Sequence, residues 1–370
     1  MKKSSYKVLL GVLLSTCSFA SESKIIASNE LREGKMERVL EKIEINEDDL
    51  SSVLSQLGLT LNGSSTMPKE GRIATNLVVP TLERGDVLVR AYPEQVAEKL
   101  ETGIFGFEVR VLSHLSQHGL RVPSPLDFKN GTPLLKHKNH IYMVYPFIPG
   151  QTLEKDDLSL DVAQKSGKFV SEMVQAAVKY QPKENEDLPE GDLDHLRKCY
   201  EKQSNKFPEI LDTPTFQEMR SFIDNDDVKG MIEASPKGIV HSDFFFENFV
   251  VDKEETAAID FGDAYYGSVV MDIAIAAMEF SAVEDQQWNF EYIREFLKPN
   301  ISWLSTHGFD VKKFIDVMKV NCLRFAIYTT PFTLDEGESL ANNPYVLRFQ
   351  YLKNAEVISN IEKIFNENTL

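Results

Sequence analysis

The sequence predicts an α+β fold in which a small β-rich part precedes a larger, mainly helical part. The chain has 370 residues, 42% of them hydrophobic, which is enough to bury a large core and to form two lobes. Short runs rich in β-branched and aromatic residues, bounded by turn residues, fall mainly between residues 59 and 153. From residue 158 onward, apolar residues recur mostly at helical spacing.

The first twenty residues have the composition of a secretory signal peptide. Lys2, Lys3 and Lys7 flank the start of an apolar run, VLLGVLL, and small residues stand at Ser18 and Ala20. The run is too short to span a membrane. We therefore expect cleavage after Ala20, no stable membrane insertion afterwards, and a secreted or periplasmic protein. The alternative is an uncleaved apolar N-terminal helix on a cytoplasmic protein.

Composition narrows the class of partner. The formal net charge is −17, from 40 basic and 57 acidic side chains, which argues against nucleic acid as a partner. An acidic surface suits a small substrate that is cationic or zwitterionic. Of the three cysteines, Cys17 lies in the predicted signal peptide, and Cys199 and Cys322 could pair or stay free. The sequence contains no CxxC pattern.

The rest of the chain divides by pattern into three segments. Residues 21–46 are polar and charged, and we predict a linker there. Residues 47–145 open with a helix that ends at Gly58 and continue with strands. Residues 146–370 form the helical part. Within the β-rich segment, LTLNGSSTM is predicted to be a strand that runs into a turn of small residues.

The stretch from His241 to Asp272 carries the strongest chemical signal. Asn248 is followed by FVV and Asp260 is preceded by AAI, with the polar KEET between them, which predicts a hairpin with both side chains at its mouth. Gly262 would let the backbone turn sharply. Asp243 lies five residues before Asn248. Two carboxylates and an amide oxygen favour Mg²⁺, and Asp243 would be left to accept a proton.

These residues follow a known order. HxDxxxxN followed by DFG resembles the catalytic and metal-binding loops of the protein-kinase-like superfamily. The continuation DFGDAYYG and then MDIAIA resembles the aminoglycoside phosphotransferase family, whose members include kinases for homoserine, choline and hydroxylysine. The resemblance extends from about residue 50 to the C-terminus and is strongest from Val240 to Ala277. It implies a two-lobed protein-kinase-like fold.

The resemblance also implies roles for the residues of this stretch. Asp243 would accept or orient the proton of the attacking hydroxyl, and Asn248 and Asp260 would hold Mg²⁺. Three further side chains would support the loop or the substrate. His241 would brace the loop by hydrogen bonds and Asp272 would cap local N–H groups, whereas Asp263 would face either the substrate or the solvent.

Nucleotide binding is expected from the β-rich part. Arg90, in the strand VLVRAY, would grip the ATP phosphates, and Glu108, in the following helix, would orient it. Gly63, Ser64 and Ser65 stand where kinase-like enzymes cover the phosphates, although an ordinary hairpin turn explains them equally well. We expect the backbone near Tyr145 and Phe147, before the Pro-Gly pair, to contact adenine.

The implied reaction is transfer of the γ-phosphoryl group of ATP, or of GTP, to a hydroxyl of a small molecule. The expected acceptors are an amino alcohol, a hydroxy-amino acid of the homoserine or hydroxylysine type, or an aminoglycoside. DFGDAYYG departs from strict homoserine kinases and is closer to hydroxylysine-kinase-like relatives. The alternatives are a non-catalytic kinase-like nucleotide-binding protein and a secreted effector protein kinase. The short segment from DFG to Asp272 leaves no room for a long activation loop.

Overall fold

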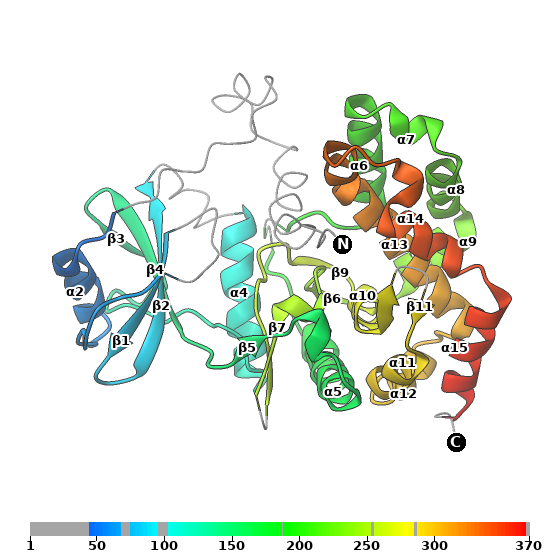
Figure 1. Ribbon diagram of the computed structural model, residues 1–370. Helices are drawn as coiled ribbons and strands as arrows, with labels where there is room; N and C mark the ends of the chain where they lie inside the picture. Colours follow the sequence, from blue (N-terminus) through cyan, green and yellow to red (C-terminus); the bar gives the residue numbers. More distant parts are fainter. Residues whose placement is uncertain are drawn as a thin grey trace. The chain divides into compact units, whose positions relative to one another are not determined.

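The computed structural model describes residues 44–67, 75–94, 103–184, 186, 188–252, 255–284 and 287–367. The predicted signal peptide over residues 1–20 lies outside these ranges, as does the predicted linker apart from its last residues. The chain forms two compact units, one ending at Pro149 and the other beginning at Gly150 (Figure 1). Within the described ranges, no helix combines the length and the apolar character needed to cross a bilayer.

The unit that ends at Pro149 is built on one antiparallel sheet with the strand order β1-β2-β4-β3. The strands are β1 (Thr75–Thr81), β2 (Gly85–Pro93), β3 (Leu135–His137) and β4 (His140–Pro146). Helices α2 (Glu47–Ser55) and α4 (Gly103–Gln117) lie on opposite faces of this sheet (Figure 1). The small β-rich part that the sequence predicts is therefore confirmed.

Alternation along the strands separates these two faces. In β2, Val87 and Val89 are fully buried in a core that includes Leu54 of α2. Successive side chains of a strand point to opposite sides, so Arg90 lies on the other face, where it meets Glu108 of α4. The apolar face stabilises the sheet, and the opposite face presents the charged pair.

The segment before β1 differs from the prediction. LTLNGSSTM does not form a regular strand, because it pairs with β1 only at two isolated bridges, Leu61 with Thr81 and Thr66 with Val78. Between the bridges the chain is largely exposed, and Gly63 adopts a φ of 122°, which interrupts the ladder. The helix before it ends as predicted, with Gly58 in the left-handed region at a φ of 70°.

The unit that begins at Gly150 is mainly helical, as predicted. Its helices are α5 (Leu160–Ala177), α6 (Leu193–Lys206), α7 (Glu209–Asp212), α8 (Pro214–Ile223), α9 (Asp226–Ala234), α10 (Val270–Ser281), α11 (Phe290–Leu297), α12 (Ile301–Thr306), α13 (Val311–Asp335), α14 (Pro344–Tyr351) and α15 (Ala355–Glu367). Short 3-10 turns are η3 (Lys155–Asp157), η4 (Phe246–Asn248) and η5 (Leu340–Asn342). All residues of α10 are buried, so this helix forms the centre of the unit.

Small sheets in this unit carry the loops of interest. The three-stranded sheet has the order β5-β7-β8, and the two-stranded sheets are β6-β9 and β10-β11. Their bounds are β5 (Gln151–Thr152), β6 (Lys237–Val240), β7 (Phe249–Val251), β8 (Thr256–Ala258), β9 (Tyr265–Ser268), β10 (Ala282–Glu284) and β11 (Gln287–Trp288). The antiparallel pairing of β7 with β8 confirms the predicted hairpin.

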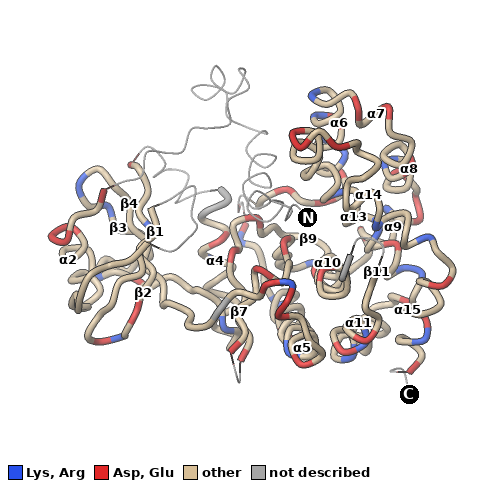
Figure 2. Tube along the Cα trace, viewed as in Figure 1, with Lys and Arg blue, Asp and Glu red and all other residues tan. Residues whose placement is uncertain are grey.

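Two features left open or general in the sequence are settled by the structure. Cys199 and Cys322 are both buried and neither forms a disulfide, so they do not pair with each other. Acidic residues occur along the chain in both units (Figure 2).

Candidate active site

The loop after β6 is held in place by hydrogen bonds to the first turn of α10. Strands β6 and β9 pair with Val240 opposite Tyr265, and the chain then leaves β6 into His241. The backbone N–H groups of His241 and Ser242 donate to the two carboxylate oxygens of Asp272, at 2.7 and 2.8 Å. Ser242 adopts a φ of 72°, so this anchor holds a strained backbone. Asp272 therefore sets the path of the loop.

We expect Asp272→Ala to destabilise the fold. The substitution leaves two buried N–H groups without their acceptor, at about 1–3 kcal/mol each. Burial raises the pKa of Asp272 to about 7, so removing this carboxyl offsets part of the loss. Denaturant unfolding should show a decrease of about 2–4 kcal/mol. Asp310→Ala, which removes a single exposed N-cap bond to Lys313, should cost about 1 kcal/mol; equal losses in both variants would contradict the anchor.

His241 connects the loop to the hairpin. Its Nε2 lies 3.0 Å from the carbonyl oxygen of Ile259, and its Nδ1 accepts from the N–H of Asp243 at 3.3 Å. This arrangement requires the neutral tautomer with the proton on Nε2. Burial lowers the pKa of His241 to about 4. The ring also packs on Phe244 and Phe261, with centroid distances of 4.2 and 4.4 Å. His241 therefore holds position and exchanges no proton near neutral pH.

Asp243 presents one oxygen without a hydrogen-bond partner. Its Oδ2 accepts from Asn248 Nδ2 at 2.9 Å, and its backbone carbonyl accepts from the same nitrogen at 2.7 Å. Its Oδ1 is buried and makes no hydrogen bond. Burial, together with the nearby charge of Asp260, raises the pKa of Asp243 to about 7. One carboxyl oxygen is thus fixed by a hydrogen bond, and the other has no partner. This arrangement lets the second oxygen accept a proton from another group.

Asp260 lies at the mouth of the hairpin. The chain turns at Gly262 as predicted, with the N–H of Ala264 donating to the carbonyl oxygen of Phe261 at 3.1 Å. Gly262 has no positive φ, and the left-handed backbone is at Asp260, with a φ of 66°. Aspartate tolerates this region better than most residues. The N–H of Ile259 donates to the carbonyl oxygen of Asn248 at 2.9 Å, which brings Asn248 beside Asp260 across the hairpin. The carboxylate is exposed at this mouth.

The donors at this mouth suit a hard cation that also binds other oxygens. Because Asn248 donates from Nδ2 to Asp243, the Oδ1 of Asn248 is the atom that can bind a cation. Together with Asp260 it offers one amide oxygen and one carboxylate, a set that fits Mg²⁺ held partly by substrate phosphates and water. Within the described residues there is no cluster of three His, Cys, Asp or Glu side chains that could hold a metal alone. These donors therefore fit a metal that arrives with a nucleotide.

In the unit that ends at Pro149, the structure pairs Arg90 with Glu108. Arg90 Nη1 lies 3.7 Å from Glu108 Oε1, and the Glu108 side chain is buried. The guanidinium also stands over the ring of Tyr145, 5.0 Å from its centroid. Strand β2 and helix α4 thus place the two residues that the sequence singles out in contact on one face of the sheet.

The other predicted nucleotide contacts lie in the same unit. Gly63 and Ser64 are exposed and Ser65 is half-buried, in the loop between the two isolated bridges. Tyr145 is buried, whereas the Phe147 ring is 38% exposed. The Phe147 N–H already donates to the carbonyl oxygen of Asp86 at 3.3 Å, so it is not available to a base. These positions stay predictions for nucleotide binding.

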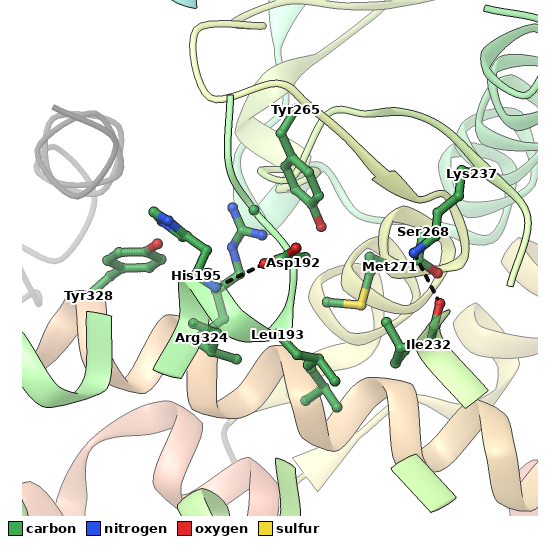
Figure 3. A pocket seen from close by; sticks show the side chains of 13 residues that line it. Asp192, Leu193, His195, Ile232, Lys237, Tyr265, Ser268, Met271, Arg324 and Tyr328 are labelled. Carbon is green, nitrogen blue, oxygen red and sulfur yellow. Dashed lines mark hydrogen bonds between the residues drawn. The ribbon is translucent and has the colours of Figure 1, made fainter. Parts of the chain in front are cut away.

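A pocket that the sequence analysis did not identify lies beside the anchored loop (Figure 3). Its lining includes Tyr265, which pairs with the last residue of β6, and Met271, which precedes Asp272. Asp192 and Arg324 also line it. The space in and above it is about 430 Å³ when open solvent is included, and about 20 Å³ of this can hold the centre of a water-sized sphere. The signal that the sequence offers for this pocket is a single arginine in an apolar helical run, NCLRFAIY.

Comparison with known proteins agrees with this geometry. Residues 68–309 match the phosphotransferase enzyme family. A homoserine kinase of Rhizobium etli is 25% identical over 247 residues, which cover 66% of this chain and 73% of that protein.

Solved structures of small-molecule kinases share the fold. An amicoumacin kinase in complex with AMP-PNP, Ca²⁺ and Ami has a TM-score of 0.57 at 18% identity, covering 85% of this chain and 94% of that one. An aminoglycoside phosphotransferase from Alicyclobacillus acidocaldarius has a TM-score of 0.56 at 11% identity, covering 88% and 98%. An ethanolamine kinase of Plasmodium vivax has a TM-score of 0.56 at 12% identity, covering 85% of each chain. The predicted protein-kinase-like fold is confirmed, and because the family match spans more than half of the sequence, the chain belongs to the phosphotransferase enzyme family.

Proposed function

We propose that this phosphotransferase transfers the γ-phosphoryl group of ATP to a hydroxyl of a small molecule that carries an amino group. The acceptor classes are an amino alcohol, a hydroxy-amino acid or an aminoglycoside. The observation that carries the proposal is the buried Oδ1 of Asp243, which has no hydrogen-bond partner while Asn248 holds its sister oxygen. A protein that only binds nucleotide has no need of such an oriented proton acceptor.

The reaction then follows from the loop geometry. The acceptor hydroxyl donates its hydrogen bond to Asp243 Oδ1 and attacks the γ-phosphorus. A new O–P bond forms, the bond from the γ-phosphorus to the bridging oxygen breaks, and ADP leaves with that oxygen. The hydroxyl proton passes to Asp243, whose pKa of about 7 suits a group that gains and loses a proton near neutrality.

Asn248 and Asp260 would hold the Mg²⁺ that accompanies the nucleotide. When bound, the ion neutralises charge that builds up on the phosphate oxygens. The chain's own contribution is to keep the donors in place: the hairpin fixes Asn248 against Ile259, and the left-handed backbone turns Asp260 outward. In the other unit, Arg90, oriented by Glu108, supplies a fixed cation for the nucleotide phosphates.

Activity should depend on pH through Asp243. The carboxyl must be ionised to accept a proton, and its pKa is raised above the usual range, so kcat/KM for the acceptor should rise with pH up to about 7 and then level. A cation beside Asp260 weakens the repulsion that helps to raise this pKa, so with saturating Mg·ATP the inflection should lie at or below 7. Initial rates between about pH 5 and pH 9 test this. A profile that falls as pH rises through this range would contradict the assignment.

The experiment that tests the proposed function is a screen for phosphorylated product. The protein is incubated with Mg·ATP and with homoserine, hydroxylysine, ethanolamine, choline and an aminoglycoside in turn, and the products are identified by mass spectrometry. At least one acceptor should gain a phosphoryl group while an equal amount of ADP forms. The same screen with GTP would show which nucleotide is used.

A further inference from the structure

Arg324 is a buried cation in the pocket beside the catalytic loop. It extends from α13, is only 7% exposed, and lines the pocket with Tyr265 and Tyr328. Its guanidinium lies over both rings, 5.2 Å from the centroid of Tyr265 and 6.0 Å from that of Tyr328. Its Nε is buried and has no hydrogen-bond partner. The two rings leave the guanidinium edge directed at the pocket (Figure 3).

The charge of Arg324 is not matched by a contacting carboxylate. Among the described residues no Asp or Glu forms an ion pair with it, and Asp263, Asp243 and Asp272 act on it only at longer range. Arg348 is about as buried in the same unit, and its charge is balanced by a direct ion pair with Glu279. A buried guanidinium without a paired anion is costly to the fold. An anionic ligand group would complete the site.

The pocket also holds one negative group suited to an ammonium. Asp192 faces the same space as Arg324, and one of its oxygens accepts from the N–H of His195 at 2.9 Å (Figure 3). His195 adds no cation near neutral pH, because burial lowers its pKa. Lys237, the other basic lining residue, donates to the carbonyl oxygen of Ile232 at 3.3 Å. The pocket is therefore lined by a guanidinium and a carboxylate that do not form an ion pair with each other.

We propose that this pocket is the acceptor subsite and that it selects a hydroxy-amino acid. Arg324 binds the α-carboxylate, Asp192 binds the α-ammonium, and the hydroxyl extends toward the loop that carries Asp243. The loop lies next to the pocket because Tyr265 pairs with Val240, one residue before the loop begins. This inference rests on the proposed function and narrows it: an amino alcohol without a carboxylate leaves Arg324 unmatched and is a poor acceptor.

The test compares matched ligands on matched variants. Homoserine and hydroxylysine are each paired with the amino alcohol that lacks only the carboxylate. Binding is measured by calorimetry in the presence of a non-hydrolysable ATP analogue, and phosphoryl transfer is measured separately. Arg324→Gln removes the charge, Arg324→Lys keeps it without the planar fork, and Lys312→Gln removes an exposed cation of the same helix that does not line the pocket.

For at least one pair, the wild type should bind the amino acid more tightly than its amino alcohol. Arg324→Gln should weaken binding of the amino acid by about 10- to 100-fold, the range for a hydrogen bond to a charged group. Its affinity for the amino alcohol should change by less than about threefold. The affinity of Arg324→Lys for the amino acid should lie between those of the wild type and Arg324→Gln, and Lys312→Gln should bind both ligands about as tightly as the wild type. The wild-type comparison stands even if a variant fails to fold.

Several results would overturn the subsite. The first is failure of the wild type to bind either amino acid, and the second is equal affinity of the wild type for an amino acid and its matched amino alcohol. The third is an equal loss of affinity for both ligands in Arg324→Gln, which would indicate that Arg324 only balances nearby loop carboxylates. The proposed reaction fails separately. Binding of the amino acid that depends on Arg324, without phosphoryl transfer, would contradict the reaction and support the subsite. Transfer to amino alcohols in preference to amino acids would support the reaction and contradict the subsite.

Discussion

Asp260→Ala should abolish Mg·ATP-dependent phosphoryl transfer, with a loss of at least about three orders of magnitude. Asp260 is the carboxylate at the hairpin mouth that we assign to the metal, and Asn248 offers only a neutral amide oxygen beside it. The side chain is exposed, so its removal leaves no cavity and the fold should persist. Nucleotide should still bind weakly without metal.

The measurement is a steady-state rate over a range of Mg²⁺ concentrations, with nucleotide titration in parallel. The matched control is Asp252→Ala at the opposite end of the hairpin, where the Asp252 carboxylate accepts from the N–H of Glu255 at 2.8 Å. That variant should keep its activity. Unchanged turnover in Asp260→Ala would remove the kinase mechanism altogether.

Asp243→Asn should lower turnover by about two to four orders of magnitude, the usual contribution of a general base. The substitution keeps size and shape, and the Asn side-chain oxygen can still accept from Asn248 in place of Asp243 Oδ2. The open Oδ1 position becomes an amide nitrogen that cannot take a proton. Affinity for Mg·ATP should change little, because Asp243 is assigned to the hydroxyl and not to the metal.

Nucleotide titration and product formation are measured on the wild type and on Asp243→Asn together. A non-catalytic binding protein would form no product in the wild type, so the substitution would have nothing to remove. Equal product formation in the two proteins would show that Asp243 is not the base. The role would then pass to a nearby carboxylate such as Asp263.

The parts of the site that could be predicted from sequence are those set by local structure. A hairpin of short apolar runs brings Asn248 and Asp260 together because the two strands are contiguous, and β7 and β8 pair as the pattern predicts. Asp272 lies in the first turn of α10, where it accepts from two loop N–H groups. The contact between Arg90 and Glu108 likewise needs only a strand and the next helix.

The parts that could not be predicted depend on packing between distant segments or on fine backbone choice. Arg324 reaches the pocket only because α13 packs beside β9, so the sequence showed merely an arginine in an apolar run. The turn at Gly262 was expected, but the left-handed backbone at Asp260 was not, because aspartate is one of the few residues other than glycine that adopt this region. The segment around Gly63 reads as a strand, but it meets β1 at only two points.

The central claim, that the chain is a small-molecule kinase using Asp243, is tested most directly by following the γ-phosphorus of ATP. The wild type and Asp243→Asn are supplied with ATP labelled at that position, Mg²⁺ and the acceptor panel, and the labelled products are separated. The account predicts that label moves onto a hydroxyl of one small acceptor in the wild type and is nearly absent from it in Asp243→Asn. Label that stays on ATP with every acceptor, appears only as inorganic phosphate, or moves onto protein would contradict it.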